Sequence, residues 1–237
     1  MSLADRVVLV TGATGALGRA AVRGFATDGC RLGLGGTSPE RLREVAEEAG
    51  LPDDRWVAAV GDLRTSDGAA GAAAAVVARF GRIDVLVHVV GGFVPGGPIP
   101  ELDPDAFRAM LDQHLWTTLF VTRAVVPGMV ERGWGRVLAV TASNTATAPA
   151  RTAIYTTTKT AQETLLRVLA RETAGSGVTV NVVVAKTVDA DHQRELDPNA
   201  KNAAWATPEE IVATFRFLAS DEAAPITGAR IPLDGRA

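Results

Sequence analysis

The sequence of 237 residues has few of the residues that build cross-links, metal clusters or cationic surfaces. A single cysteine, Cys30, excludes a disulfide framework and a cysteine metal cluster, and we predict no bound metal. The net charge is −3 and no basic block occurs, so we expect no nucleic-acid partner. No apolar run approaches the roughly 20 residues that span a bilayer. Since the N-terminal residues also lack the shape of a signal peptide, we predict a cytoplasmic protein without a membrane partner.

What the sequence does contain is a regular alternation of apolar runs and helical patterns. Mostly apolar strands, several of them rich in β-branched residues, are predicted over residues 7–10, 31–35, 56–60, 83–90, 136–140, 178–184 and 229–233. Strands that are apolar throughout and separated by helices form parallel sheets covered on both faces. We therefore predict a single α/β domain over residues 1–237, with a doubly wound parallel sheet of about seven strands and helices on both faces.

Three helical features and two irregular stretches complete this pattern. Asp103-Pro104 should open a long helix to about residue 130, which Pro127 should kink or end. Thr207-Pro208-Glu209-Glu210 is a capping box that opens another helix. Residues 91–101 and 189–206 are the least regular and follow strand ends. In an open parallel sheet the ligand crevice lies there, so both stretches are candidate substrate walls.

A glycine-rich loop, Thr11-Gly12-Ala13-Thr14-Gly15-Ala16-Leu17-Gly18, follows the first strand and opens the first helix. Its small residues let the backbone approach a pyrophosphate, and the helix N-terminus offers free N–H groups. Between a strand and a helix at the start of a βαβ unit, the loop predicts a dinucleotide site.

The end of the second strand favours NADP(H) over NAD(H). An acidic residue there would hold the ribose hydroxyls and repel a 2′-phosphate. This chain has Gly35-Gly36-Thr37-Ser38, with no acid before Glu40. Thr37 and Ser38, with Arg41 or Arg19 nearby, could accept the phosphate. The alternative is that Glu40 turns back, or that the two cofactors are not discriminated.

The only tyrosine, Tyr155, stands four residues before Lys159, one of three lysines. Residues four apart on a helix share a face, so the phenol and the ammonium can point into one site. A neighbouring cation favours the phenolate and lowers a tyrosine pKa that is normally about 10. Such a tyrosine can act as a general acid and base near neutral pH.

Together these motifs resemble the short-chain dehydrogenase/reductase family, in its short branch, over essentially the whole chain. The resemblance rests on the glycine loop, Asp62, Tyr155 and Lys159, and further on Ile83–Val87, Val180-Asn181, Phe217–Asp221 and Ile226–Gly228.

The resemblance implies a Rossmann-like NAD(P)-dependent oxidoreductase, commonly a homotetramer. It implies that Asp62 and Leu63 lie beside the adenine, that Tyr155 gives or takes the substrate proton, and that Lys159 binds the nicotinamide ribose and lowers the tyrosine pKa. The full set of predicted cofactor contacts is Gly12, Thr14, Gly15, Leu17, Gly18, Thr37, Ser38, Asp62, Leu63, Val90, Gly91, Tyr155, Lys159 and Val188.

The chain departs from the family at several site positions. Ala142 stands where the catalytic serine is usual, and Ser143 or Thr141 could present a hydroxyl instead. His114 stands at the position of the family's asparagine, where its imidazole could join a proton relay or simply pack. Among these four residues, we predict catalytic roles for Ser143 and His114.

Two further turns of the family are changed. The Asn-Asn-Ala-Gly turn is His88-Val89-Val90-Gly91 here, which predicts the same backbone path without the asparagine hydrogen bonds and with His88 as a core residue. The Pro-Gly after the sixth strand becomes Ala185-Lys186. Lys186 could meet a cofactor phosphate, an anionic substrate or solvent.

We predict an NADP(H)-dependent oxidoreductase that moves a hydride between nicotinamide and a carbonyl or alcohol carbon of a small molecule, with Tyr155 as general acid and base. A homotetramer or homodimer is expected. Two alternatives stay open: reduction of a C=N bond or conjugated ring without the usual serine, and a family member that binds the cofactor without catalysis.

Overall fold

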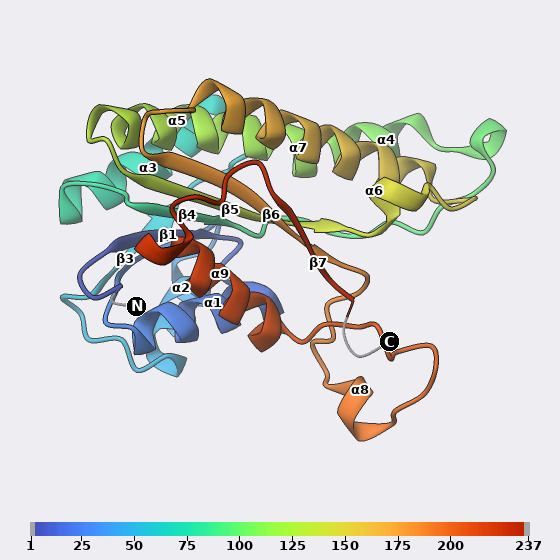
Figure 1. The fold of residues 1–237 in the computed structure, drawn as a ribbon, viewed down its shortest axis with the longest axis horizontal. Coiled ribbons are helices and arrows are strands. Elements are labelled where there is room, and N and C mark those ends of the chain that lie inside the picture. The colour runs from blue at the N-terminus through green and yellow to red at the C-terminus, as the bar shows by residue number, and fades with distance from the viewer. Residues whose placement is uncertain (1–2, 235–237) are drawn as a thin grey trace.

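The computed structural model describes residues 3–234, which contain a seven-stranded parallel sheet (Figure 1). The strands are β1 (Val7–Thr11), β2 (Arg31–Gly36), β3 (Trp56–Val60), β4 (Val85–His88), β5 (Gly135–Ala142), β6 (Val178–Ala185) and β7 (Arg230–Leu233). Their order in the sheet is β3-β2-β1-β4-β5-β6-β7, and every pair is parallel. The order reverses between β1 and β4, and ligand crevices form at such a point.

Helices cover both faces of the sheet (Figure 1). One layer contains α1 (Ala16–Thr27), α2 (Pro39–Glu48) and α9 (Pro208–Ala219), and the other contains α3 (Ser66–Phe80), α5 (Thr117–Glu131) and α7 (Ala153–Glu172). Buried aliphatic side chains of the strands pack against each layer in a separate cluster. The predicted fold class is confirmed. Of the predicted domain, residues 1–2 and 235–237 lie outside the described part.

The capping signals of the sequence mark real helix starts. The Ser38 hydroxyl accepts from the backbone N–H of Arg41 at the start of α2. Thr207 and Glu210 form both bonds of a capping box at the start of α9. The side chain of Asp103 accepts from the N–H of Asp105 at the start of α4 (Pro104–Leu111).

The predicted long helix from residue 103 to 130 is interrupted, but Pro127 is not the cause. Between α4 and α5 lies a π-helical turn, Asp112–Trp116, which sequence analysis did not predict. The hydroxyls of Thr117 and Thr118 donate to the carbonyls of Gln113 and His114, 2.6 Å away in each case, and support the widened turn. Pro127 lies on an exposed face inside α5, so the carbonyl that loses its amide partner is near solvent and the helix continues.

The connections after the strand ends are largely irregular. The predicted fourth strand is shorter than expected, because Val89 and Val90 leave the sheet after β4. Short helical turns occur at Ile99–Glu101 (η1), Asn144–Thr147 (α6), Gln193–Leu196 (α8) and Asp221–Ala223 (η3). Among residues 3–234, no helix combines the length and apolarity needed to cross a bilayer.

Candidate active site

A cavity of about 370 Å³ lies where the carboxyl ends of β1, β4, β5 and β6 meet. The glycine loop after β1 forms one side. Tyr155 and Lys159 from α7 and the segment after β6 form the other. Its lining residues are Gly12, Gly15, Ala16, Leu17, Gly18, Val89, Val90, Gly91, Gly92, Phe93, Val140, Thr141, Tyr155, Lys159, Ala185, Lys186, Thr187, Val188 and Ala190.

The glycine loop has the geometry that a pyrophosphate requires. Gly12 has a φ of +75°, and a Cβ added at Gly18 would lie 2.1 Å from the carbonyl oxygen of Gly12. Glycine is therefore needed for the loop to close onto α1. The N-cap of α1 is Gly15, which has no side chain to cap the helix. The first N–H groups of the helix are therefore available to an anionic ligand.

A second cavity, of about 480 Å³, continues from the first and shares Gly12 and Val90 with it. Gly36, Thr37, Asp62, Leu63 and Arg64 are among the residues that line it. The Asp62 carboxylate accepts from the backbone and the side chain of Arg64, at 3.0 and 2.8 Å, and these hydrogen bonds lower its pKa. Two adjoining cavities separated by a glycine loop suit the two halves of a dinucleotide.

Every predicted cofactor contact lines one of these two cavities except Ser38. The Ser38 hydroxyl caps α2 and donates to the Glu40 carboxylate, 2.8 Å away. Glu40 also lines neither cavity, and the choice between NADP(H) and NAD(H) stays a prediction. Arg19 donates to the carbonyl of Thr14 in the glycine loop and forms an ion pair with Glu48.

The Tyr155 ring lies between two aromatic neighbours. It makes edge contacts with Phe93, 5.2 Å between ring centres, and with His114, 5.7 Å away. Burial raises the pKa of Tyr155, so the expected lowering by Lys159 is not found in this structure. The reason is that the Lys159 ammonium is directed to other partners.

Lys159 is buried beneath the same cavity. Its Nζ donates to the carbonyl of Val140 at 3.3 Å and to Oε1 of Gln162 at 3.0 Å. Burial lowers the pKa of Lys159 to about 8, because the charged form has lost its water. A pKa of about 8 means that Lys159 can change its charge at a mildly alkaline pH.

His114 is fully buried in the π-helical turn and does not line the cavity. Its Nδ1 lies 2.9 Å from the Thr158 hydroxyl, which donates to the carbonyl of Tyr155. The Gly92 N–H donates to Nε2 at 3.4 Å. These partners fit a neutral ring protonated at Nδ1, and burial lowers the His114 pKa to about 3.

His88 replaces hydrogen bonds that the sequence predicted to be lost. Its Nδ1 lies 2.8 Å from the Thr11 hydroxyl of β1, and its Nε2 lies 3.0 Å from the Thr118 hydroxyl of α5. The turn lacks asparagine side chains, and the His88 imidazole supplies different hydrogen bonds at its first position. Burial lowers the His88 pKa to about 3, so the ring is a neutral core residue, as expected.

Three residues at the end of β5 lie at or beside the position of the catalytic serine, and each has a different environment. Thr141 lines the cavity, but its hydroxyl donates to the Glu163 carboxylate at 3.3 Å. Ala142 is buried in the sheet. Ser143 does not line the cavity. Its N–H donates to the carbonyl of Ala185, and its hydroxyl makes no hydrogen bond with residues 3–234.

Sequence analysis missed two polar residues on α7. Gln162 joins Lys159 to the Thr118 hydroxyl, and Glu163 accepts from Thr145 at 2.9 Å and from Arg230 of β7 at 3.0 Å. Gln162 is three residues beyond Lys159, so the helical spacing that joined Tyr155 to Lys159 could have revealed it.

The glycine loop lies at the N-terminus of a helix, and Tyr155 and Lys159 lie across the same cavity. This arrangement is typical of oxidoreductases that use a nicotinamide dinucleotide. Comparison with known proteins bears this out: the family model described as short chain dehydrogenase matches residues 6–201. The chain therefore belongs to the short-chain dehydrogenase/reductase family and is an oxidoreductase.

Relatives match along almost the full chain. An acetoacetyl-CoA reductase from Cupriavidus necator is 29% identical, over 98% of each chain. The BbsC subunit of a hydroxy(phenyl)methylsuccinyl-CoA dehydrogenase from Thauera aromatica is 34% identical, over 94% of this chain and 90% of its own. A solved structure of a single-substitution variant of the actinorhodin polyketide ketoreductase with NADPH has a TM-score of 0.85 at 26% identity, over 98% of this chain and 96% of its own.

Proposed function

We propose that this protein is an NADP(H)-dependent oxidoreductase that interconverts a carbonyl group and an alcohol in a small molecule, with Tyr155 as general acid and base. One observation carries the proposal: Tyr155 and Lys159 line the same cavity as the glycine loop. The acetoacetyl-CoA reductase and the ketoreductase among its relatives support the carbonyl chemistry.

A bound nicotinamide would supply the hydride for reduction or accept it in oxidation. In reduction, the Tyr155 phenol gives its proton to the carbonyl oxygen as the new C–H bond forms, and it takes a proton in the reverse direction. Lys159 supplies positive charge that stabilises the phenolate once its ammonium turns from Gln162 toward the phenol. Phe93 packs edge-on against the phenol ring.

Two further residues are assigned roles in this proposal. Ser143 supplies a hydroxyl that orients the substrate oxygen, since this hydroxyl makes no hydrogen bond with residues 3–234, whereas Thr141 already donates to Glu163. His114 receives the Gly92 N–H at Nε2 and packs on the Tyr155 ring. It orients the phenol through this ring contact, while its Nε2 lone pair accepts from the Gly92 N–H.

The substitution Tyr155→Phe tests the assignment, because it keeps the ring contacts and removes the proton. We expect turnover to fall by about 10² to 10⁴, the usual contribution of a general acid. Cofactor affinity, measured by fluorescence titration, should change little. Unchanged turnover on a substrate that the wild type reduces would overturn the mechanism.

The preference for NADP(H) is supported by the end of β2, where Thr37 lines the second cavity and no acid follows before Glu40. The NADPH-bound ketoreductase among the similar structures is consistent with it. The Glu40 carboxylate accepts from the Ser38 hydroxyl at 2.8 Å and does not line this cavity. Dissociation constants for NADPH and NADH decide the matter.

A second candidate is reduction of a C=N bond or a conjugated ring. It is favoured by the position of Ser143 outside the cavity lining, since such a substrate would not need a hydroxyl on its oxygen. Comparing NADPH oxidation on matched ketone and imine substrates separates the two reactions.

We also propose that the protein forms a homodimer or homotetramer through the outer face of α5 and α7. A groove of about 900 Å³ follows these helices, and Leu119, Val126, Leu165 and Val168 are among its apolar lining residues. The cytoplasmic location stays a prediction.

A further inference from the structure

Lysine is rare in this protein, and most of its lysines lie at one site. Three lysines stand among 24 basic residues, and two of the three, Lys159 and Lys186, line the same cavity. Within the described part of the chain, these two are also the only charged residues in that lining. Any ligand that fills the cavity therefore meets positive charge without a compensating carboxylate.

Lys159 and Lys186 differ in what they contact. The buried ammonium of Lys159 already has two acceptors. Lys186 is exposed at the end of β6 and makes no hydrogen bond or ion pair with any residue from 3 to 234. Its charge is free to bind a group of a ligand.

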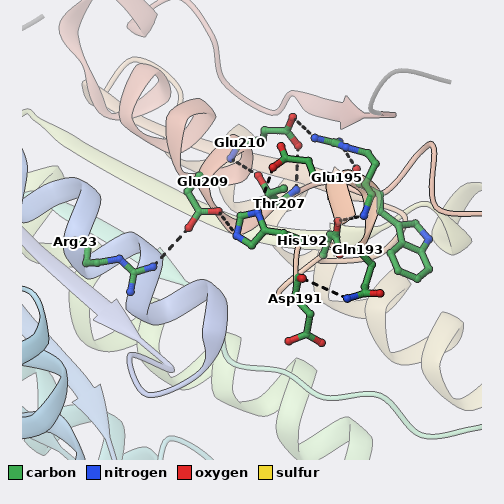
Figure 2. Close-up of polar contacts among 11 residues, drawn as sticks. Arg23, Asp191, His192, Gln193, Glu195, Thr207, Glu209 and Glu210 are labelled. Atoms are coloured by element: carbon green, nitrogen blue, oxygen red, sulfur yellow. Dashed lines mark hydrogen bonds and ion pairs between the residues drawn. The ribbon is translucent and has the colours of Figure 1, made fainter. Parts of the chain in front are cut away.

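Two of the acidic residues that follow Lys186, Asp189 and Glu195, have partners other than this lysine. Both oxygens of Asp189 accept backbone N–H groups at the start of α8, each at 2.9 Å. Figure 2 shows His192 between Glu195 and Glu209, with Arg23 approaching Glu209 from α1. None of the acidic residues of this segment forms an ion pair with Lys186, and among them the exposed carboxylate of Asp191 makes no hydrogen bond or ion pair with residues 3–234.

The sheet order places Lys186 at the reacting end of the cavity. Lys186 follows Ala185, which pairs with Ala142, and the carbonyl of Ala185 accepts from the Ser143 N–H at 3.4 Å. The glycine loop follows β1, with β4 and β5 between it and β6. Three strand spacings of about 4.8 Å separate the two positions by about 14 Å. Lys186 is therefore next to Ser143 at the sheet edge, on the opposite side of the cavity from the glycine loop.

We propose that Lys186 binds a carboxylate of the substrate, so that the protein acts on an oxo acid or a hydroxy acid. This inference rests on the proposed oxidoreductase function and names its substrate class. The carboxylate lies a few bonds from the reacting carbon, because Lys186 and Ser143 are neighbours at the ends of β6 and β5. An ammonium on a flexible stem suits a single anionic group whose exact position varies with chain length.

The test uses the full chain and a panel of 2-, 3- and 4-oxo acids, each compared with its methyl ester, with NADPH as reductant. Three variants are needed: Lys186→Met keeps the length without the charge, Lys186→Arg keeps the charge, and Lys201→Met makes the same change at an exposed lysine outside the cavity. We expect the wild type to prefer an acid over its ester. Lys186→Met should reduce kcat/KM for that acid by about 10- to 100-fold, as expected for one charge-assisted hydrogen bond, and leave the ester unchanged.

Lys186→Arg should keep most of the preference, and Lys201→Met all of it. Equal or better turnover of the ester by the wild type would overturn the inference. So would a Lys186→Met variant that slows acid and ester alike while its dissociation constant for NADPH rises, since the lysine would then hold the cofactor.

Calorimetry separates this inference from the proposed function. If the wild type reduces no carbonyl compound, the oxidoreductase proposal fails, but binding of the same oxo acids to the NADPH-loaded protein still decides the role of Lys186. Binding that is lost in Lys186→Met supports the carboxylate site. The absence of any acid binding to the wild type contradicts it.

Discussion

The Gln162 amide holds two buried groups at once. Its oxygen accepts from Lys159 Nζ at 3.0 Å, and its nitrogen donates to the Thr118 hydroxyl at 2.9 Å. The hydroxyl in turn lies 3.0 Å from His88, which reaches Thr11 at the end of β1. This chain of contacts sets the direction of the Lys159 ammonium from which it turns toward the phenol in the proposed reaction, so Gln162 is a positioning residue for the site.

Replacing Gln162 by leucine should change the pH profile of the reaction. Lys159 titrates at about 8 in the native protein, and reduction needs its charge, so kcat/KM for reduction should fall as the pH rises through that value. Gln162→Leu removes an acceptor of the charged form. We expect the descending limb to move to lower pH by about one unit.

The matched control is Gln162→Glu, which keeps an acceptor and adds negative charge. Its descending limb should move to higher pH, because a nearby carboxylate favours the ammonium. The measurement is the pH dependence of kcat/KM from about pH 6 to about pH 10, a range that spans the relevant titration. If both variants keep the wild-type profile, Gln162 only fills space.

At this scale, part of the site could be predicted from the sequence. The pairing of Tyr155 with Lys159 is predictable because helical spacing fixes which residues share a face. The direction of the Lys159 ammonium is not predictable from this spacing, because it depends on Gln162 and on the carbonyl of Val140 from another element. The same holds for the tyrosine pKa, which burial raises while the cation is held away.

At the scale of elements, β4 and α5 are joined by His88. The imidazole connects the hydroxyl of Thr11 in β1 with that of Thr118 in α5, and it is fully buried. Sequence patterns predicted the place of β4, because its residues are mostly apolar, but they overestimated its length. They could not predict the π-helical turn at Asp112–Trp116, since its support comes from threonine hydroxyls whose direction depends on the packed helices.

The buried histidines should make the fold sensitive to acid. His88 and His114 each have a pKa of about 3 in the folded protein, against about 6.5 for a free histidine. The unfolded chain therefore binds more protons below about pH 6.5, and the free energy of unfolding falls as the pH decreases from about 6.5 toward 3.

The substitution His88→Asn removes one of these titrating groups but keeps a hydrogen-bonding side chain. Between about pH 6.5 and about pH 4.5 it should lose less stability than the wild type, by about 2 kcal/mol. His114→Asn should behave in the same direction. Urea unfolding at both pH values measures the effect. A constant difference between wild type and His88→Asn across this pH range would show that His88 does not titrate on unfolding.

At the scale of the whole molecule, both helix layers and the sheet order follow from the sequence pattern. Apolar strands separated by helices have few other arrangements, because parallel strands must be covered on both faces. The outer surface is less determined. Sequence alone did not reveal the apolar groove of α5 and α7, since the residues that line it come from helices separated by β5.

A second copy of this chain should cover that groove. Val168 lies on α7 within the groove and is 48% exposed, and burying a charge there would cost free energy without a partner. We expect Val168→Glu to shift the molecular mass in light scattering toward the monomer. Val77→Glu is the matched control, because Val77 is 45% exposed on α3 and does not line the groove. A monomeric wild type, or equal dissociation of both variants, would contradict assembly through this face.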